Sequence, residues 1–425
     1  MRLKMSTSTP KDVVIIGGSL GGLFTGVALK RLNKNLNIRI FERNPTPLLH
    51  DQGAGVVAGQ EAQAFFRKHD RTKTSLTITS RQRLYLNRNG ETIDREDKEQ
   101  KMTSWDLLYH LLRANFDGVQ SEYAEPPQLK ANEGSMSYEY GCVVTDVQAP
   151  ASSPADTIDF SQPVKLTIRK HSGEEEQTNA DIVIAADGPS STMRAKYFPD
   201  AKRKYAGYVA WRGTVPEDRV SEFATAVFKE KFTFYHTEGN QILAYLIPGH
   251  HGSLQPGKRL VNYVWYCNYE EESPEHVELM TDKDGKRHHV TLPPGGIQDS
   301  VWKKQQEHAN KVLPPQFAEL VQKTEVPFIQ AITDAIAPSA VLSSGRVILL
   351  GDALANFRPH TAASTSQAAM DAMTLAEAFE RVLEGGGLKA LTDWEQEVVS
   401  YAKDVQRFGV QIGNRSQFGL HPLRG

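Results

Sequence analysis

The chain has 425 residues, 39% of them hydrophobic and 24% charged, with 49 basic against 51 acidic side chains. This length exceeds one ordinary hydrophobic core, so two domains are expected, and the near-zero net charge gives no reason to expect a nucleic-acid partner. No apolar stretch is long enough to span a bilayer, no signal-peptide core opens the chain, and two cysteines cannot form a disulfide framework, so we expect a soluble, cytoplasmic protein.

The first unit of the chain predicts a βαβ arrangement. Residues 13–16 are continuously apolar and β-branched, as in a buried parallel strand, and the glycine-rich stretch 17–22 leads into a helix over about 23–32. The next strand, 38–41, ends at Glu42. A carboxylate in that position can accept hydrogen bonds from the two hydroxyls of a ribose.

The turn between the first strand and the helix has the spacing of a dinucleotide-binding loop. Gly17 permits the tight bend and Gly22 permits close helix–strand packing, while the small Ser19 stands where a middle glycine is usual. A pyrophosphate would lie at the helix N-terminus. The alternative is a purely structural strand–turn–helix. The contacts predicted from this unit are Gly17, Gly18, Ser19, Leu20, Gly22, Glu42 and Arg43.

Further elements follow in chain order. A hairpin with an Asn-Gly turn is predicted over 81–93, a helix over 105–116, a loop over 149–163, an aromatic antiparallel sheet from 205, a polar excursion over 271–297, and helices over 301–323 and from 362 onward.

Two more apolar strands end in carboxylates. Residues 181–186 precede Asp187-Gly188, and residues 347–350 precede Gly351-Asp352. Such carboxylates point into the crevice where open α/β sheets bind ligands, and Asp352 suits the hydroxyls of a sugar-alcohol chain. The alternative is that each aspartate caps the next helix. Past Pro359, helix N–H groups near Ala362 and Ala363 are predicted to face a cofactor carbonyl.

Together these segments resemble the FAD-dependent aromatic hydroxylases of the p-hydroxybenzoate hydroxylase type. Residues 186–194 (Ala-Asp-Gly-Pro-Ser-Ser-Thr-Met-Arg) match the family's second fingerprint with one conservative change. The third fingerprint is matched by Gly351-Asp352-Ala353, Pro359, Ala368, Asp371-Ala372 and Leu375-Ala376. Segments 207–213, 281–285, 292–295 and 358–360 resemble the 2,6-dihydroxypyridine 3-hydroxylase-like branch.

The chain also departs from the family pattern. Ala355 replaces a usual histidine, Ala362 and Ser364 replace usual glycines, and Trp105 stands where many relatives have an arginine beside the cofactor. The changes at Ala355, Ala362 and Ser364 favour one rival, a degenerate FAD-binding sensor or scaffold without turnover. A second rival, an epoxidase- or halogenase-type relative, would share the FAD fingerprints. Residues 211–216 do not supply the W-x-W-x-I-P stretch expected of a halogenase.

The resemblance implies an α/β fold (α+β overall) with a Rossmann-like FAD-binding domain that is discontinuous in sequence. That domain would comprise 11–72, 101–204 and 331–400; an inserted antiparallel-sheet substrate domain would comprise 73–100 and 205–330, and 401–425 would form a C-terminal helix or tail. It also implies that NAD(P)H reduces FAD as a transient co-substrate. O₂ then forms a flavin C4a-hydroperoxide that hydroxylates a small aromatic or N-heteroaromatic, hydroxypyridine-like ring. A homodimer is one option for the assembly.

Candidate catalytic residues are His360, which follows the third fingerprint, and His50, near the Gly53–Gly55 turn where relatives wrap backbone round the flavin. Gly55 is counted among the cofactor contacts. For both histidines the alternative is capping or packing. Trp211 and Arg212 could face the substrate, and the alternative for them is sheet packing and a surface ion pair. We expect core or cross-strand aromatics, and not catalytic phenols, in Tyr235, Tyr245 and Tyr263. His288 and His289 are expected to be solvated, and no metal site is predicted.

Overall fold

A six-stranded sheet forms the centre of one lobe in the computed structural model, which describes residues 11–49, 55–128, 130, 133–151 and 157–419. Its strand order is β17 (Val341–Leu342), β18 (Val347–Leu349), β10 (Ile182–Ala185), β1 (Asp12–Ile16), β2 (Asn37–Phe41) and β6 (Ser135–Glu139). All neighbours are parallel except β17 and β18. The three predicted carboxylate- or glycine-ended strands are therefore confirmed as neighbours, with Ile15 opposite Ile184 and Ile184 opposite Ile348.

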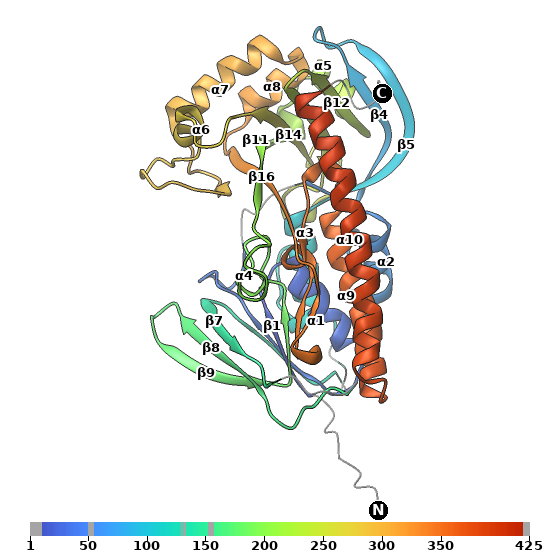
Figure 1. Cartoon of the computed structure of the whole chain (residues 1–425). Coiled ribbons are helices and arrows are strands. Elements are labelled where there is room, and N and C mark those ends of the chain that lie inside the picture. Colours follow the sequence, from blue (N-terminus) through green and yellow to red (C-terminus); the bar gives the residue numbers. More distant parts are fainter. Residues whose placement is uncertain (1–10, 50–54, 129, 131–132, 152–156, 420–425) are drawn as a thin grey trace, which may run out of the picture.

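Helices pack against this sheet and against one another (Figure 1). They are α1 (Leu20–Lys30), α2 (Gln60–His69), α3 (Trp105–Asp117), α9 (Ser364–Leu383) and α10 (Gly387–Phe418). The predicted helix at 105–116 is confirmed, and the one predicted at 23–32 begins three residues earlier because the glycine turn leads directly into it. A separate three-stranded sheet and a short helix complete the lobe: β7 (Cys142–Gln148), β8 (Val164–Lys170), β9 (Glu175–Ala180) and α4 (Thr192–Tyr197).

A ten-stranded sheet forms the second lobe. Its order is β15 (Thr291–Leu292), β16 (Phe328–Ile336), β11 (Lys204–Pro216), β14 (Leu260–Asn268), β13 (Asn240–Ile247), β12 (Lys231–Thr237), β4 (Ile78–Leu86), β5 (Thr92–Ser104) and β3 (Gly55–Val57), with β19 (Ala355–Asn356) paired to β16. The predicted hairpin is β4–β5, and the predicted antiparallel run is confirmed for β11 to β14. Strands β12 and β4, however, are parallel.

The two faces of the large sheet have different neighbours. One face packs on α5 (Glu222–Phe228), α7 (Asp299–Val312) and α8 (Pro315–Lys323), and on this side the Trp211 ring lies 5.8 Å from the Trp302 ring. The helical segment predicted over 301–323 is two helices, because Pro314 and Pro315 lack the backbone N–H groups needed to continue α7. The polar excursion contains α6 (Pro274–Leu279) and β15.

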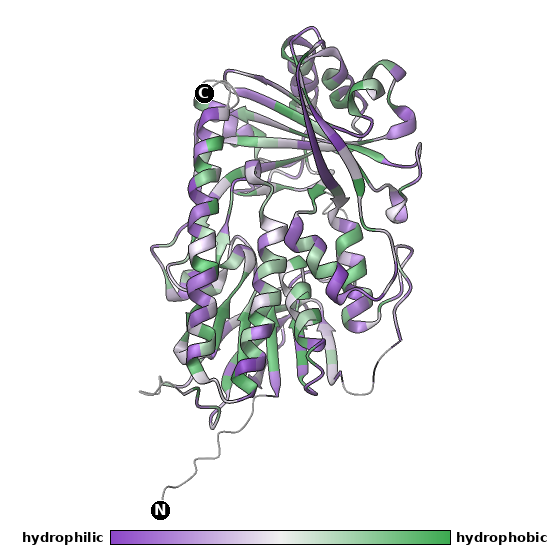
Figure 2. Cartoon of the chain, turned by 90° about the vertical axis from the view of Figure 1, so that its right-hand side faces the viewer, coloured by the Kyte–Doolittle hydropathy of each residue, from purple (hydrophilic) through white to green (hydrophobic). Residues whose placement is uncertain are grey.

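Helix α10 extends along both lobes without a break at residue 400 (Figures 1 and 2). Near its start, Trp394 donates a hydrogen bond to Thr374 of α9 at 3.0 Å. Near its end, Gly413 is packed so closely that a Cβ there would lie 2.5 Å from the Tyr208 hydroxyl of β11. Figure 2 shows hydrophilic and hydrophobic residues alternating along the helix, as expected for an element that buries only one side.

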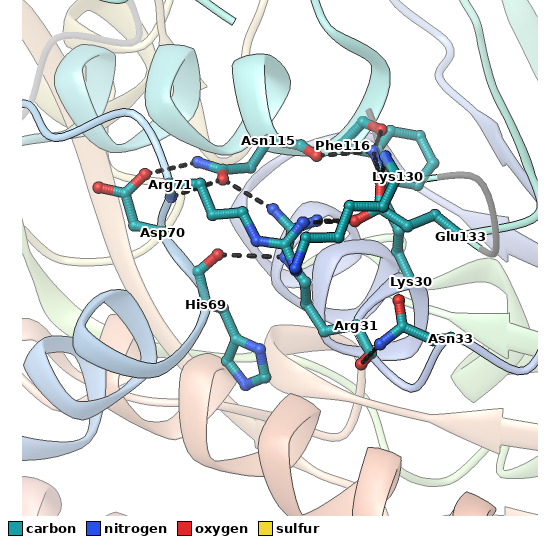
Figure 3. Close-up of polar contacts among 10 residues, drawn as sticks. All are labelled: Lys30, Arg31, Asn33, His69, Asp70, Arg71, Asn115, Phe116, Lys130 and Glu133. Carbon is teal, nitrogen blue, oxygen red and sulfur yellow. Dashed lines mark hydrogen bonds and ion pairs between the residues drawn. The ribbon is translucent and has the colours of Figure 1, made fainter. Parts of the chain in front are cut away.

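The C-terminal ends of α1, α2 and α3 meet around a buried ionic cluster (Figure 3). Lys30 donates to the carbonyl oxygens of Asn115 and Phe116, and Arg31 donates to that of His69. Glu133, only 3% exposed, pairs with the cations of Lys30, Arg31 and Arg71. Asp70 and the negative ends of the three helix dipoles offset the remaining positive charge.

In the part of the chain covered by the structure, no helix combines the length and apolarity that crossing a bilayer requires. Cys142 and Cys267 are both buried and free.

Candidate functional site

The dinucleotide turn is held by close backbone contacts. Gly17 has a φ of +100°, and a Cβ there would lie 2.4 Å from the carbonyl oxygen of Ala186, which directly follows the neighbouring β10. A Cβ on Gly22 would lie 1.9 Å from the Gly17 carbonyl oxygen. The Ser19 side chain makes no capping hydrogen bond to α1, so the first N–H groups of that helix have no side-chain acceptor. An anionic ligand would fit there.

Glu42 fixes the other side of this turn. Its two carboxylate oxygens accept the N–H groups of Gly18 and Asn44, each at 2.8 Å, and the Tyr138 hydroxyl donates to the Gly18 carbonyl at 2.9 Å. Each carboxylate oxygen keeps a further lone pair, so Glu42 can still accept ligand hydroxyls. Leu20 is buried and Arg43 is exposed beside this turn.

Asp187 in part caps the helix that follows it, which is the alternative that the sequence left open. One oxygen accepts the backbone N–H of Thr192 at 2.7 Å and its hydroxyl at 3.0 Å, which caps α4. The other oxygen is buried with no hydrogen-bond partner. Gly188, at φ +78°, faces open space where a Cβ would meet nothing within 4 Å. A ligand donor could therefore reach the free oxygen.

Asp352 is connected to the second segment by Arg194. The Arg194 guanidinium donates to the carbonyl oxygens of Asp352 and Ala353, each at 3.0 Å. Burial raises the pKa of the Asp352 carboxyl to about 6, while the positive charges of Arg203 and Arg194 lower it. Sequence patterns alone did not mark either arginine as a site residue, although Arg194 ends the second fingerprint and Arg203 follows it closely.

Asp371 supports the adjoining turn from α9. Its carboxylate accepts the N–H of Gly351 at 3.1 Å, and burial raises its pKa to about 7. Past Pro359, Ala362 adopts a left-handed φ of 52°, a conformation in which glycine is usual, and Ala363 precedes α9 with no capping side chain. This second long helix thus also presents N–H groups without a side-chain acceptor. Ala355, in place of the usual histidine, is buried in β19.

A cavity of about 880 Å³ lies between the large sheet and the segment that contains Asp352 and Pro359. Asp352, Pro359, His360, Ala362 and Ala363 line it from one side. Trp105, Gly55, Val56 and Val57 also line it, with Phe408, Gln411, Ile412 and Arg415 of α10. The sheet contributes Arg83, Tyr85, Arg212, Phe232, Phe234, His236, Gln241, Leu243, Tyr245, Val264, Tyr266 and Gln330. These sheet residues alternate along their strands, so one pleat face forms the wall.

His360 is in the cavity wall and is neutral at ordinary pH. Its Nε2 shares a hydrogen bond with the Tyr208 hydroxyl at 3.0 Å, and its ring lies 4.4 Å from that of Tyr266. Burial, and then the charges of Arg358 and His236, lower its pKa to about 3. The other candidate, His50, lies outside the described residues, as do Gly53 and Ala54.

Arg212 and Trp211 point to opposite faces of β11. Trp211 is 1% exposed and packs against α7, whereas Arg212 lines the cavity. Arg212 donates to the Gln330 side-chain oxygen at 3.2 Å, and its Nε–H is buried without a partner. A buried unpaired donor is costly, so an acceptor from a ligand would stabilise it. Tyr245 also lines the cavity, while Tyr235 and Tyr263 belong to the core on the far face.

The expectation of solvated histidines is wrong for His288. Its Nε2 lies 2.7 Å from an Asp282 carboxylate oxygen, and its side chain is only 16% exposed. A polar loop can still bury a histidine when a neighbouring turn supplies an acceptor. Among the residues with described positions, no cluster of three histidine, cysteine or carboxylate side chains could hold a metal.

These groups fit a flavin dinucleotide. Two long helices begin without side-chain caps, and the free Asp187 oxygen and the cavity-lining Asp352 carboxyl lie at the ends of neighbouring strands. A family model described as "FAD binding domain-like" matches residues 205–334. The fold and site thus define an FAD-dependent flavoprotein.

Comparison with known proteins shows what the whole chain is similar to. The chain is 27% identical to the 2,6-dihydroxypyridine 3-monooxygenase of Paenarthrobacter nicotinovorans, over 97% of this chain and 94% of that protein. The structure of 2,6-dihydroxypyridine-3-hydroxylase from Arthrobacter nicotinovorans superposes with a TM-score of 0.80 at 25% identity, covering 98% and 95% of the two chains. Klebsiella pneumoniae HpxO, solved with FAD and uric acid, has the same fold (TM-score 0.69, 18% identity, 98% and 91% coverage). Over nearly its whole length the chain is therefore similar to FAD-dependent aromatic monooxygenases.

Proposed function

We propose that this monooxygenase uses NAD(P)H and O₂ to hydroxylate a small electron-rich aromatic or N-heteroaromatic ring of the hydroxypyridine type. The observation that carries the proposal is Arg212, which lines an aromatic cavity together with Asp352 and has a buried Nε–H without a hydrogen-bond partner. An ionised ring hydroxyl supplies the acceptor that this donor lacks, and an ionised ring is the more reactive nucleophile.

The cofactor contacts are proposed from the three segments and the turn that follows the second strand. They are Gly17, Gly18, Ser19, Leu20, Gly22, Glu42, Arg43, Gly55, Asp187, Gly188, Gly351, Asp352, Pro359, Ala362 and Ala363. When bound, FAD supplies the electron transfer and the activation of O₂. Within the described residues one dinucleotide turn is found, at the start of α1, so NAD(P)H is proposed to bind transiently.

The side chains of the cavity bind and orient the ring. Arg212 holds the ring oxyanion and Gln330, its hydrogen-bond partner, fixes the guanidinium. The apolar wall of Leu243, Val264 and Phe234 excludes water from the reacting atoms.

His360 is proposed to donate a hydrogen bond to the ring oxygen. The Tyr208 hydroxyl and Nε2 of His360 share a hydrogen bond at 3.0 Å, and we propose that the hydroxyl is the donor. The proton of the neutral imidazole is then on Nδ1. His360 accordingly stabilises an oxyanion and is not the base that forms it.

An NAD(P)H-consumption screen on FAD-loaded protein tests the proposal. The panel comprises 2,6-dihydroxypyridine, hydroxynicotinates and simple phenols, under ¹⁸O₂, with product mass as the readout. We expect a hydroxypyridine to accelerate NAD(P)H oxidation and to gain one ¹⁸O atom. Flavin that NAD(P)H never reduces would favour the scaffold alternative, and H₂O₂ as the sole oxygen product across the panel would overturn the substrate class.

A further inference from the structure

The cavity carries more positive than negative charge. Among its described lining residues the guanidinium groups belong to Arg83, Arg212 and Arg415, and the single carboxyl is that of Asp352. The negative charge of Asp352 is already stabilised by the positive charges of Arg203 and Arg194, which lower its pKa. A cleft of one sign with apolar walls concentrates ligands of the opposite sign. A substrate with a single ring oxyanion would neutralise only part of the positive charge of this cavity.

Arg415 belongs to a stripe on α10 that faces the cavity. Phe408, Gln411, Ile412 and Arg415 recur at intervals of three and four residues, which places them on one side of the helix. Arg415 is exposed and has no ion pair or hydrogen bond within the described structure. Its guanidinium is therefore available to a ligand.

The position of Arg415 is fixed by the next residue. The Ser416 carbonyl accepts the Nε2–H of His236 at 2.7 Å, and the Ser416 hydroxyl donates to the Gln241 side chain at 2.7 Å. His236 is on β12 and Gln241 on β13, and both line the cavity. The last turns of α10 are thus held over these two strands.

Arg212 lies on the far side of the same wall. Strand β11 is separated from β12 by β14 and β13, and Arg212 is level with Phe234 of β12, roughly 14 Å away across three strand spacings. His236 is two residues further along β12, so its backbone is roughly 16 Å from that of Arg212. Arginine side chains reaching inward from both sides leave room for one substituted ring. Arg83 is one strand further on, and it is already occupied by Gln100 at 2.7 Å and by the Phe232 and Phe234 rings.

We propose that the substrate is a hydroxylated ring that also carries a carboxylate, and that Arg415 of α10 recognises this carboxylate while Arg212 binds the ring oxygen. This inference rests on the proposed function. It predicts that charge on the substituent, and not its size, decides affinity for this enzyme.

A matched ligand pair tests the charge. FAD-loaded protein is titrated with 6-hydroxynicotinate and with its neutral, nearly isosteric amide, 6-hydroxynicotinamide, and the change in flavin absorbance gives each Kd. The carboxylate should bind up to about fivefold more tightly, because an ion pair at a partly exposed site contributes up to about 1 kcal/mol. This preference should shrink as ionic strength rises.

Variants of α10 assign the effect. Arg415→Gln should bring the two Kd values together without changing the Kd of the amide, and Arg415→Lys should keep part of the preference. Arg407→Gln is the matched control: Arg407 lies on the same helix, pairs with Asp404 at 3.5 Å and is outside the cavity lining.

Three outcomes would overturn the inference. The unmodified enzyme could bind both ligands with equal Kd, or Arg415→Gln could weaken the binding of both ligands equally. The third outcome is that Arg415→Gln raises only the KM for NAD(P)H. If hydroxypyridines without a carboxylate are hydroxylated while the first outcome holds, only this inference fails. If no ring perturbs the flavin spectrum and none is hydroxylated, the proposed function fails with it.

Discussion

The Arg194 guanidinium donates to the backbone carbonyl of Asp352, although the two residues are far apart in sequence. Further bonds run to Ala353 and Pro189, so one buried side chain joins the second cofactor segment to the third. Because Arg194 holds the backbone of Asp352, it also keeps the carboxyl of that residue at the cavity wall.

Replacement of Arg194 should therefore weaken the cofactor site and the fold together. Arg194→Gln leaves buried carbonyl oxygens unpaired, and we expect a loss of about 2 to 3 kcal/mol in the free energy of unfolding and at least about a tenfold rise in the Kd for FAD. Urea unfolding and flavin-fluorescence titration measure the two effects. Arg194→Lys, which retains donors, should lose less of both; equal losses would contradict the proposed geometry.

Arg212→Gln should lower kcat/KM for a hydroxypyridine by about a hundredfold, because the developing ring oxyanion loses its charged donor. The Kd for FAD should not change. Steady-state kinetics on the FAD-loaded enzyme provides the measurement. Arg219→Gln, on an exposed turn paired with Glu325, serves as the control and should behave as the unmodified enzyme. A kcat/KM unaffected by Arg212→Gln would remove the main support for the proposed function.

The low pKa of His360 gives a stability profile with a defined sign. Because the folded-state pKa of about 3 is below the ordinary 6.5, the unfolded chain binds the proton more readily throughout that interval. Stability should accordingly fall as the pH drops below about 6.5, by at most about 1.4 kcal/mol per pH unit from this group. Urea unfolding at several pH values, compared with His360→Gln, isolates the contribution, since His69 has a lowered pKa too. Identical slopes in both proteins would show that His360 titrates normally.

Glu133→Gln should destabilise the first lobe by about 3 kcal/mol, since Lys30 and Arg31 would remain buried without their counter-charge. Thermal or urea unfolding detects the loss. Glu380→Gln, which breaks an exposed pair with Lys34, should change stability by less than about 1 kcal/mol. Comparable effects for the two variants would mean that the cluster is merely a surface feature.

Ala362→Gly should stabilise the protein by about 0.5 to 1 kcal/mol. A left-handed alanine costs about 1 to 2 kcal/mol, of which the greater freedom of glycine in the unfolded chain offsets part. Ala363→Gly, where φ is negative, should instead be destabilising. Differential scanning calorimetry can rank the three proteins, and a gain from both substitutions would refute the argument from backbone strain.

Sequence patterns were sufficient where a residue's role depends on its own neighbours in the chain. The glycine turn, the buried strands and the hairpin all depend on local spacing, and the structure has them. The cavity wall was harder to foresee. Arg415 and Gln241 reach it from a helix and a strand whose contact depends on tertiary packing, and nothing in either local sequence marks them. The helix break at Pro314 was not predicted, because the helical periodicity continues on both sides of it. The parallel pairing of β12 with β4 was not predicted either, because pairing partners have no local signature.

The middle of the parallel sheet is assembled from the beginning, the middle and the later part of the polypeptide, with Ile15 beside Ile184 and Ile184 beside Ile348. Such a topology has a high contact order, so productive collapse must wait for distant segments to meet, and folding should be slow. A fragment that stops before β18 would leave the hydrophobic edge of β10 unpaired and would aggregate. Truncation is consequently a poor route to a minimal flavin-binding unit from this chain.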